Sequence, residues 1–225
     1  MSSMTIEGGI GGRYCVDEQA CSTLFQNIDK IIGEDLTYAI DKFDKTLDSI
    51  NDGVVWNGSV AHYQIRKLIE FYNEFRIAYN NLIEHFAVEV PKIFSNISNL
   101  SVSLGGNCLN VSKVTERNFK PKELNGSVSP LAAETGLPGA LNTSITNLQS
   151  CVGPIQDSFT RIKTEISKIG KGSEILDLSC QNPDNATLLQ ESVNSYIGNL
   201  DMAHKEALEE AIDAMRKAVV RITQG

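Results

Sequence analysis

Two long stretches of the chain carry apolar residues at steps of three or four positions, and a short polar segment separates them. This spacing places the apolar side chains along one face of an α-helix. Such helices are not stable alone in water, so each must bury its apolar face against another helix. The first stripe comprises Leu24, Ile28, Ile32, Leu36, Ile40, Phe43, Leu47 and Ile50. The second comprises Ile65, Leu68, Tyr72, Phe75, Tyr79, Leu82, Phe86, Val90, Ile93 and Ile97.

The segment between the stripes predicts a tight connection between two antiparallel helices. Gly53 and Gly58 permit backbone angles that other residues resist. Trp56 is the only tryptophan, and its large apolar ring is suited to cover the open end of a hairpin while its indole N–H bonds a partner. We therefore predict a helical hairpin over residues 20–100, with a kink or an early end at Pro91.

The second half of the chain repeats the pattern without a tryptophan. Its first stripe comprises Leu141, Ile145, Leu148, Val152, Ile155, Phe159, Ile162, Ile166 and Ile169. Its second comprises Leu189, Val193, Tyr196, Leu200, Ala203, Ala207, Ala211, Met215, Ala218 and Ile222. Gly153-Pro154 predicts a kink in the first of these helices, and Pro183-Asp184-Asn185 predicts the start of the second. We predict a second helical hairpin over residues 139–225.

The remaining residues are expected to connect and flank these hairpins. Residues 101–138 alternate in polarity and then become rich in glycine, proline and serine, which predicts a strap that is irregular or contains a small β element. Residues 1–19 are expected to be irregular. The predicted fold is all-α: two long antiparallel hairpins form a four-helix bundle with the strap between them. Pairing on one chain buries both apolar faces, and self-association is the alternative.

The cysteines do not indicate a metal site. Five occur, at positions 15, 21, 108, 151 and 180, without a C-x-x-C pair or a histidine at zinc-binding spacing. We expect thiols. The alternative is a disulfide between Cys15 and Cys108, which an antiparallel first hairpin would bring together.

Charge and hydropathy exclude two classes of partner. A net charge of -8 and a pI near 4.9 disfavour a nucleic-acid surface, which concentrates lysine and arginine. No segment is apolar for the roughly 18 residues of a membrane span. The N-terminus has no basic segment followed by an apolar core, so no secretory signal is predicted. Asn-x-Ser/Thr recurs along the chain, and we interpret it as composition and not as glycosylation.

No set of residues indicates catalysis, a cofactor or a metal. A two-metal carboxylate site in a bundle needs two Glu-x-x-His pairs, and only Asp201-x-x-His204 approximates one. Neither G-x-S-x-G nor a phosphate-binding glycine loop followed by Lys-Ser/Thr occurs. His62, His85 and His204 are expected on solvated or boundary faces, with Glu89 as a helix-surface neighbour of His85. We therefore predict a protein that is not an enzyme.

The arrangement helix, Trp56-Asn57-Gly58, helix resembles the small Trp-x-Gly substrates of bacterial type VII (ESX-type) secretion, the early-secreted-antigen-like helical hairpins. The resemblance covers about residues 20–100. It implies recognition through Trp56, Asn57 and Gly58, with Trp56 partly exposed. It also implies export to the medium or cell surface without a signal peptide, contact with a secretion ATPase, and a role in virulence or interbacterial competition.

That family also carries a Tyr-x-x-x-Asp/Glu export signal after the second helix, and this chain departs from the pattern. The literal match, Tyr14 to Glu18, precedes the hairpin, Phe119 to Glu123 has phenylalanine for tyrosine, and Tyr196 to Asp201 is one residue too long. We therefore expect a partner, either a small helical hairpin protein or a larger toxin, to supply the signal. The alternative function is a cytosolic helical adaptor or regulator. Replacing Trp56 by alanine should abolish recognition with little loss of stability, unless Trp56 merely caps the hairpin.

Overall fold

The computed structural model describes residues 4–8, 12–16, 18–90, 92, 119–169, 183–202 and 205–224, which are mostly helical. The prediction that residues 1–19 are irregular is wrong, because strands β1 (Met4–Gly8) and β2 (Gly12–Val16) pair there in antiparallel register, Met4 opposite Val16.

The first predicted stripe is helical from end to end, but it changes its helix type. α1 (Glu18–Lys30) continues into a π-helical segment, η1 (Ile31–Leu36), and then into α2 (Thr37–Ile50). All the predicted apolar positions of this stripe are buried. A π-helical segment shifts the helix face by one residue, so a stripe on both sides of it can remain directed inward.

The second stripe forms α3 (Ser59–Glu84), followed by a second π-helical segment, η2 (His85–Glu89). Pro91 lies outside the described residues. The short strand β3 (Trp56–Asn57) precedes α3 and pairs with β4 (Thr135–Gly136) at the end of the strap. The described part of the strap, residues 119–137, is otherwise without helix or strand.

The second half contains α6 (Pro138–Ser167), α7 (Pro183–Met202) and α8 (Lys205–Gln224). α6 remains helical through Pro154. Ala203 and His204 lie outside the described residues. The residues predicted as one final helix are therefore described as two, α7 and α8.

The chain divides into two compact units that follow neither predicted hairpin. The first unit consists of Met1–Asp35, Tyr79–Thr115 and Asp157–Asn199. The second unit consists of Leu36–Ala78, Glu116–Gln156 and Leu200–Gly225. α3 and α6 contribute residues to both units, so each unit combines segments from both halves of the sequence.

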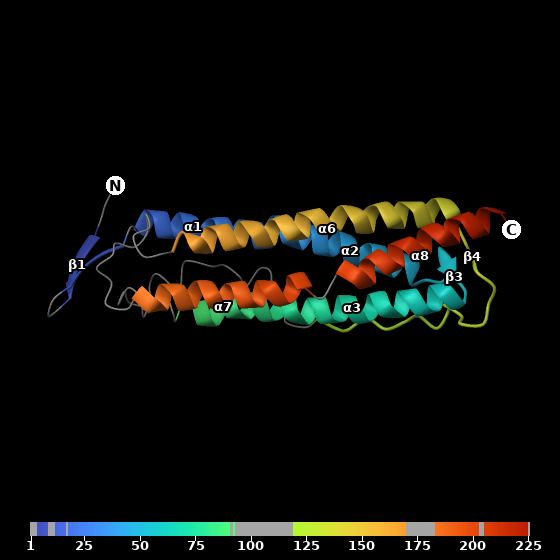
Figure 1. The fold of residues 1–225 in the computed structure, drawn as a ribbon, viewed down its shortest axis with the longest axis horizontal. Helices are drawn as coiled ribbons and strands as arrows, with labels where there is room; N and C mark the ends of the chain where they lie inside the picture. The colour runs from blue at the N-terminus through green and yellow to red at the C-terminus, as the bar shows by residue number, and fades with distance from the viewer. Residues whose placement is uncertain are drawn as a thin grey trace. The chain divides into compact units, whose positions relative to one another are not determined.

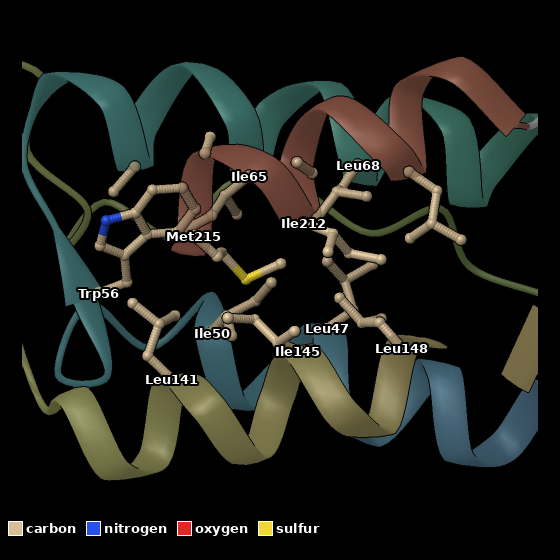
Figure 2. Close-up of a cluster of buried hydrophobic side chains, with 14 of the residues drawn as sticks. Leu47, Ile50, Trp56, Ile65, Leu68, Leu141, Ile145, Leu148, Ile212 and Met215 are labelled. Atoms are coloured by element: carbon tan, nitrogen blue, oxygen red, sulfur yellow. The ribbon is translucent and has the colours of Figure 1, made fainter. Parts of the chain in front are cut away.

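The core of the second unit is a cluster of buried apolar side chains from α2, α3, α6 and α8. Figure 2 shows these side chains directed toward one another between the helices, with Trp56 at one end of the cluster. The labelled residues are Leu47, Ile50, Trp56, Ile65, Leu68, Leu141, Ile145, Leu148, Ile212 and Met215. The strap runs along α3 toward β3 (Figure 1) and contributes buried Val128 to the same cluster.

The first unit buries apolar residues of α1, η1, α3, η2, α6 and α7. Polar contacts link its segments: Asn27 of α1 donates to Glu165 of α6 at 3.3 Å, and Gln190 of α7 donates to the Ile169 carbonyl at 2.9 Å.

Candidate functional site at the helix junction

The junction, residues 51–58, is a turn shaped by side-chain acceptors. The carboxylate of Asp52 accepts hydrogen bonds from the backbone N–H groups of Val54 at 2.7 Å and Val55 at 3.2 Å. This local bonding pattern is the reason that Asp and Asn favour turns over helices. Gly53 follows with φ +77°, a conformation that a side chain would strain. The chain is thus redirected from α2 into β3.

Trp56 is wholly buried, with 0% of its surface exposed, so the prediction of a partly exposed tryptophan is wrong. Its ring lies in the same cluster as Ile65 and Met215 (Figure 2). The indole Nε1–H donates to Oε1 of Glu134 in the strap at 3.0 Å. The other carboxylate oxygen of Glu134 accepts from Nε of Arg221 in α8 at 2.6 Å. Trp56 therefore joins the junction to the strap and, through Glu134, to α8.

Gly58 is required by the close approach of the strap. Its φ is +119°, and a Cβ at this position would lie 2.8 Å from the Cα of Glu134. The adjacent β3–β4 pair places Asn57 opposite Thr135, and the Leu137 N–H donates to the Val55 carbonyl at 3.1 Å. A residue larger than glycine would force these backbones apart. Trp56 and Gly58 thus each have a local structural reason in this chain.

Three asparagine side chains hold the backbone of the strap, and each both donates and accepts hydrogen bonds. Asn73 of α3 donates to the Lys122 carbonyl at 2.9 Å and accepts from the Lys122 N–H at 2.8 Å. Asn51, at the end of α2, donates to the Glu123 carbonyl and accepts from the Asn125 N–H, both at 3.0 Å. These carboxamides satisfy backbone groups that would otherwise need a neighbouring strand.

Asn57 completes this arrangement and uses every hydrogen-bonding position of its side chain. Nδ2 donates to the carbonyls of Gly53 at 3.2 Å and Ser127 at 3.0 Å. Oδ1 accepts from the N–H groups of Gly58 at 2.8 Å and Ser129 at 2.9 Å. A carboxamide offers two donors and one oxygen with two lone pairs, so Asn57 is fully satisfied by backbone.

Lys122 fixes the start of the strap through charge. Its Nζ lies 3.0 Å from Oδ1 of Asp44 and 2.5 Å from Oδ1 of Asp48. It also lies 5.7 Å from the ring centroid of Tyr72, a cation–π distance. Burial lowers the pKa of Lys122, but hydrogen bonds to Asp48 and Asp44 more than offset this effect, so its pKa lies above the ordinary value. Lys122 stays charged at neutral pH.

Of the three sequences that approximate the Tyr-x-x-x-Asp/Glu export signal, the structure describes the aromatic side chains of two, Phe119 and Tyr196. Phe119 packs against the core of the second unit, edge-on to Tyr72 with ring centroids 6.1 Å apart, and the guanidinium of Arg76 lies 5.0 Å from its ring. Tyr196 of α7 stacks on His85 in the first unit. The side chains of Tyr14 and Glu18 lie outside the described residues.

Three exposed apolar side chains lie on the turn and the strap, the two segments that meet at Trp56. Leu131 in the strap is 94% exposed, Val54 in the turn is 61% exposed, and Leu137 after β4 is 52% exposed. We call these three residues the junction surface. A hydrogen bond on each side of Leu131 fixes the loop that presents it: the Ser129 N–H donates to Oδ1 of Asn57, and the Trp56 indole donates to Glu134. Exposed apolar groups held on a fixed loop are suited to contact another protein.

His85 is buried, so the prediction that it lies on a solvated or boundary face is wrong. Its Nε2 lies 2.8 Å from Oγ of Ser192, and its ring stacks on Tyr196 with centroids 4.4 Å apart. Since the Ser192 hydroxyl donates to the Leu189 carbonyl at 3.1 Å, we assign the proton of this contact to His85. Burial lowers the pKa of His85, with Glu89 opposing the shift. The Ser192 proton is thus hydrogen-bonded to the Leu189 carbonyl, so His85 does not accept it and does not activate Ser192 as a nucleophile.

Several further expectations can be placed only in part. Cys151 is a buried free thiol, whereas Cys108 and the side chain of Cys15 lie outside the described residues, so the predicted disulfide does as well. Within the described ranges, no group of three potential metal ligands occurs. No helix in the part of the chain that was searched is long and apolar enough to cross a membrane.

Sequence reasoning located the junction but missed what holds it. Glu134, the acceptor for Trp56, lies 78 positions along the chain in a segment without periodicity. Of the three asparagines that hold the strap, only Asn57 belongs to the Asn-x-Ser/Thr recurrence that we interpreted as composition, and nothing in the sequence singled out Asn51 or Asn73 as strap contacts. No family model matches the chain, and no curated protein or solved structure matches it significantly.

Proposed function

We propose that this chain is a non-enzymatic helical protein that acts by binding other proteins and is exported by, or associated with, a type VII secretion system. The observation that carries the proposal is the junction itself. A W-x-G sequence connects two antiparallel helical segments, and both Trp56 and Gly58 have a structural role there. The resemblance to early-secreted-antigen-like hairpins therefore extends from the sequence pattern to its position between helices.

The arrangement that we propose for the second unit is a four-helix bundle. Its buried cluster draws side chains from α2, α3, α6 and α8, and polar contacts connect helices from both halves of the chain. Lys42 of α2 donates to Ser150 of α6 at 2.7 Å, and Lys67 of α3 donates to Glu210 of α8 at 2.9 Å. A bundle completed within one chain supports action as a folded unit that presents a surface.

Trp56, Asn57 and Gly58 act in this proposal as the support of the recognition surface. The burial of Trp56 removes its ring from direct contact with a partner, while the junction surface of Val54, Leu131 and Leu137 remains accessible. We propose that a partner, either a small helical hairpin protein or a larger toxin, buries these apolar side chains. That partner would supply the Tyr-x-x-x-Asp/Glu signal and be exported together with this chain.

A cytosolic helical adaptor is the second candidate, and one observation favours it. Because Trp56 and Gly58 are explained by packing against Glu134 and the strap, the W-x-G pattern does not by itself require an export role. Export separates the two candidates.

The test is secretion from a bacterium with a type VII system, compared with a strain whose secretion ATPase is inactive. We expect the protein in the culture supernatant of the strain with the intact ATPase and not in that of the inactive strain. A cytosolic marker protein should remain inside the cells of both strains. Leu131→Ser should abolish export without lowering the melting temperature, since Leu131 is exposed. Tyr38→Ser is the matched control, because Tyr38 is an exposed apolar residue of α2 that lies outside the junction surface. Retention of wild-type protein in the cells of both strains would support the adaptor.

Co-purification under non-denaturing conditions tests the partner. We expect one stoichiometric helical protein with a Tyr-x-x-x-Asp/Glu sequence, which Leu131→Ser fails to retain. Efficient export of this chain from a strain that lacks its neighbouring genes would overturn the partner proposal while leaving export itself intact.

A further inference from the structure

Two Asn-Gly dipeptides contact the same strap residue. Asn57-Gly58 lies in the junction, where Nδ2 of Asn57 donates to the Ser127 carbonyl at 3.0 Å. Asn125-Gly126 lies in the strap, where Oδ1 of Asn125 accepts from the N–H and the hydroxyl of Ser127 at 3.0 and 2.9 Å. A glycine after asparagine leaves the backbone nitrogen unobstructed by a Cβ, so this nitrogen can approach the carboxamide carbon.

The reaction that this approach permits is deamidation through a succinimide. The glycine nitrogen loses its proton and bonds to Cγ of the asparagine, and the side-chain amide nitrogen leaves as ammonia. Water then adds to one of the two ring carbonyls and opens the ring. The product is aspartate, or isoaspartate when the main chain continues through Cβ and Cγ. Each event exchanges one ammonia for one water, and no oxidant or other reactant is needed.

The junction protects Asn57 from this reaction. Its carboxamide makes four hydrogen bonds to backbone, and one of them is the acceptance from Gly58 N at 2.8 Å. An N–H that points at the carbonyl oxygen lies near the plane of the amide, away from the face of Cγ that a nucleophile must approach. Glu134 confines Gly58, so rotation into the reactive geometry requires the junction to open.

Asn125 is less confined than Asn57. Both Asn125 and Gly126 are exposed, and no atom lies within 4 Å of the position that a Cβ on Gly126 would take. The Asn125 carbonyl accepts from the Val128 N–H at 3.0 Å, its side-chain oxygen accepts the two bonds from Ser127, and its N–H donates to Oδ1 of Asn51 at 3.0 Å. We propose that Asn125-Gly126 is a site of spontaneous deamidation in the folded protein, whereas Asn57-Gly58 reacts only when the junction opens.

Modification at Asn125 would release one section of the strap. In isoaspartate the former backbone carbonyl of residue 125 becomes a free carboxylate, and an extra carbon enters the main chain. The hydrogen bond from the Val128 N–H to the Asn125 carbonyl is then lost. The main chain between the residue that contacts Asn51 and the residue that contacts Asn57 also becomes one atom longer. This inference goes beyond the binding function and does not depend on export.

The test is incubation of the full folded chain at mildly alkaline pH in ¹⁸O-water, followed by peptide mass spectrometry. We expect deamidation at Asn125 at least about tenfold faster than at Asn57, since Asn57 must wait for local opening. In denaturant the two rates should become similar. Gly126→Ala is the control, because the open space tolerates a methyl group that slows ring closure. Similar rates in the folded protein, or no slowing by Gly126→Ala, would overturn the proposal.

Hydrogen exchange tests the structural consequence. Amides of residues 122–129 should exchange faster in the isoaspartate form than in the unmodified protein. An Asn125→Asp variant introduces the charge without the extra carbon and should exchange like the unmodified protein. Unchanged exchange in the isoaspartate form would show that the strap does not loosen.

Discussion

Trp56 combines an apolar ring in the core with a hydrogen bond that crosses to the strap, so its loss should affect stability directly. We predict that Trp56→Ala lowers the free energy of unfolding by about 3–5 kcal/mol, the usual cost of truncating a buried aromatic residue. Trp56→Phe should lose less. Urea denaturation measures the change, with exposed Leu131→Ala as the control. A small loss for Trp56→Ala would restore the sequence-based expectation that this residue serves recognition more than folding.

His85 predicts a dependence of stability on pH in the mildly acidic range. Above its ordinary pKa of 6.5, His85 is neutral in both the folded and the unfolded chain. Below that pH the unfolded chain binds a proton while burial keeps the folded residue neutral, so the free energy of unfolding falls. The fall ends when the pH reaches the lowered pKa of the folded state. Denaturation midpoints across this range should show the slope in the wild type and in His62→Gln, and His85→Gln should remove it.

The sequence predicts burial well for most residues of the helical stripes, with Tyr196 of α7 an exception at 37% exposed, and poorly for residues outside them. Ile28, Leu47 and Ile65 are buried as expected, because burial on a helix follows its periodicity. His85 and Trp56 were misjudged for another reason. Their burial depends on Ser192, Tyr196 and Glu134, and no local pattern indicates which distant residues will meet them.

The strap shows how an element without regular structure is held by side chains of its neighbours. We predict that Asn73→Ala lowers stability by about 1–3 kcal/mol, since it leaves the N–H and carbonyl of Lys122 without their partner. Hydrogen exchange at residues 119–125 should rise at the same time. Asn142→Ala, at an exposed position of α6, is the control. Unchanged exchange in Asn73→Ala would mean that Lys122 and its carboxylates hold the strap alone.

At the level of elements, the helices were predictable and their exceptions were not. The apolar period located α1, α2, α3 and α6, but it did not reveal η1 or η2, because steps of three and four residues are compatible with either helix type. The strap was expected to be irregular or to carry a small β element, and its β4 pairs with β3 beside Trp56. The strand pair β1–β2 was missed, since residues 1–19 were expected to be irregular.

For the whole molecule, order along the sequence does not define the compact units. We expected one hairpin over residues 20–100 and another over 139–225, whereas each unit takes segments from both of these ranges. The apolar stripes identify which helix faces must be buried, but many different helices could cover the same face. Contacts such as Lys67 with Glu210 specify the choice, and they join residues 143 positions apart.

This interleaving predicts that neither half of the chain folds alone. Residues 1–118 lack the α6 and α8 side chains that complete the cluster around Trp56, and residues 119–225 lack α2 and α3. Each half by itself should melt without cooperativity. Mixing them should give a one-to-one complex, seen by light scattering, with a cooperative melt. Because Trp56 is the only tryptophan, its fluorescence should shift to shorter wavelength as the complex forms and the indole becomes buried. Cooperative unfolding of either half alone, with Trp56 already buried in residues 1–118, would show instead that a hairpin is the folding unit.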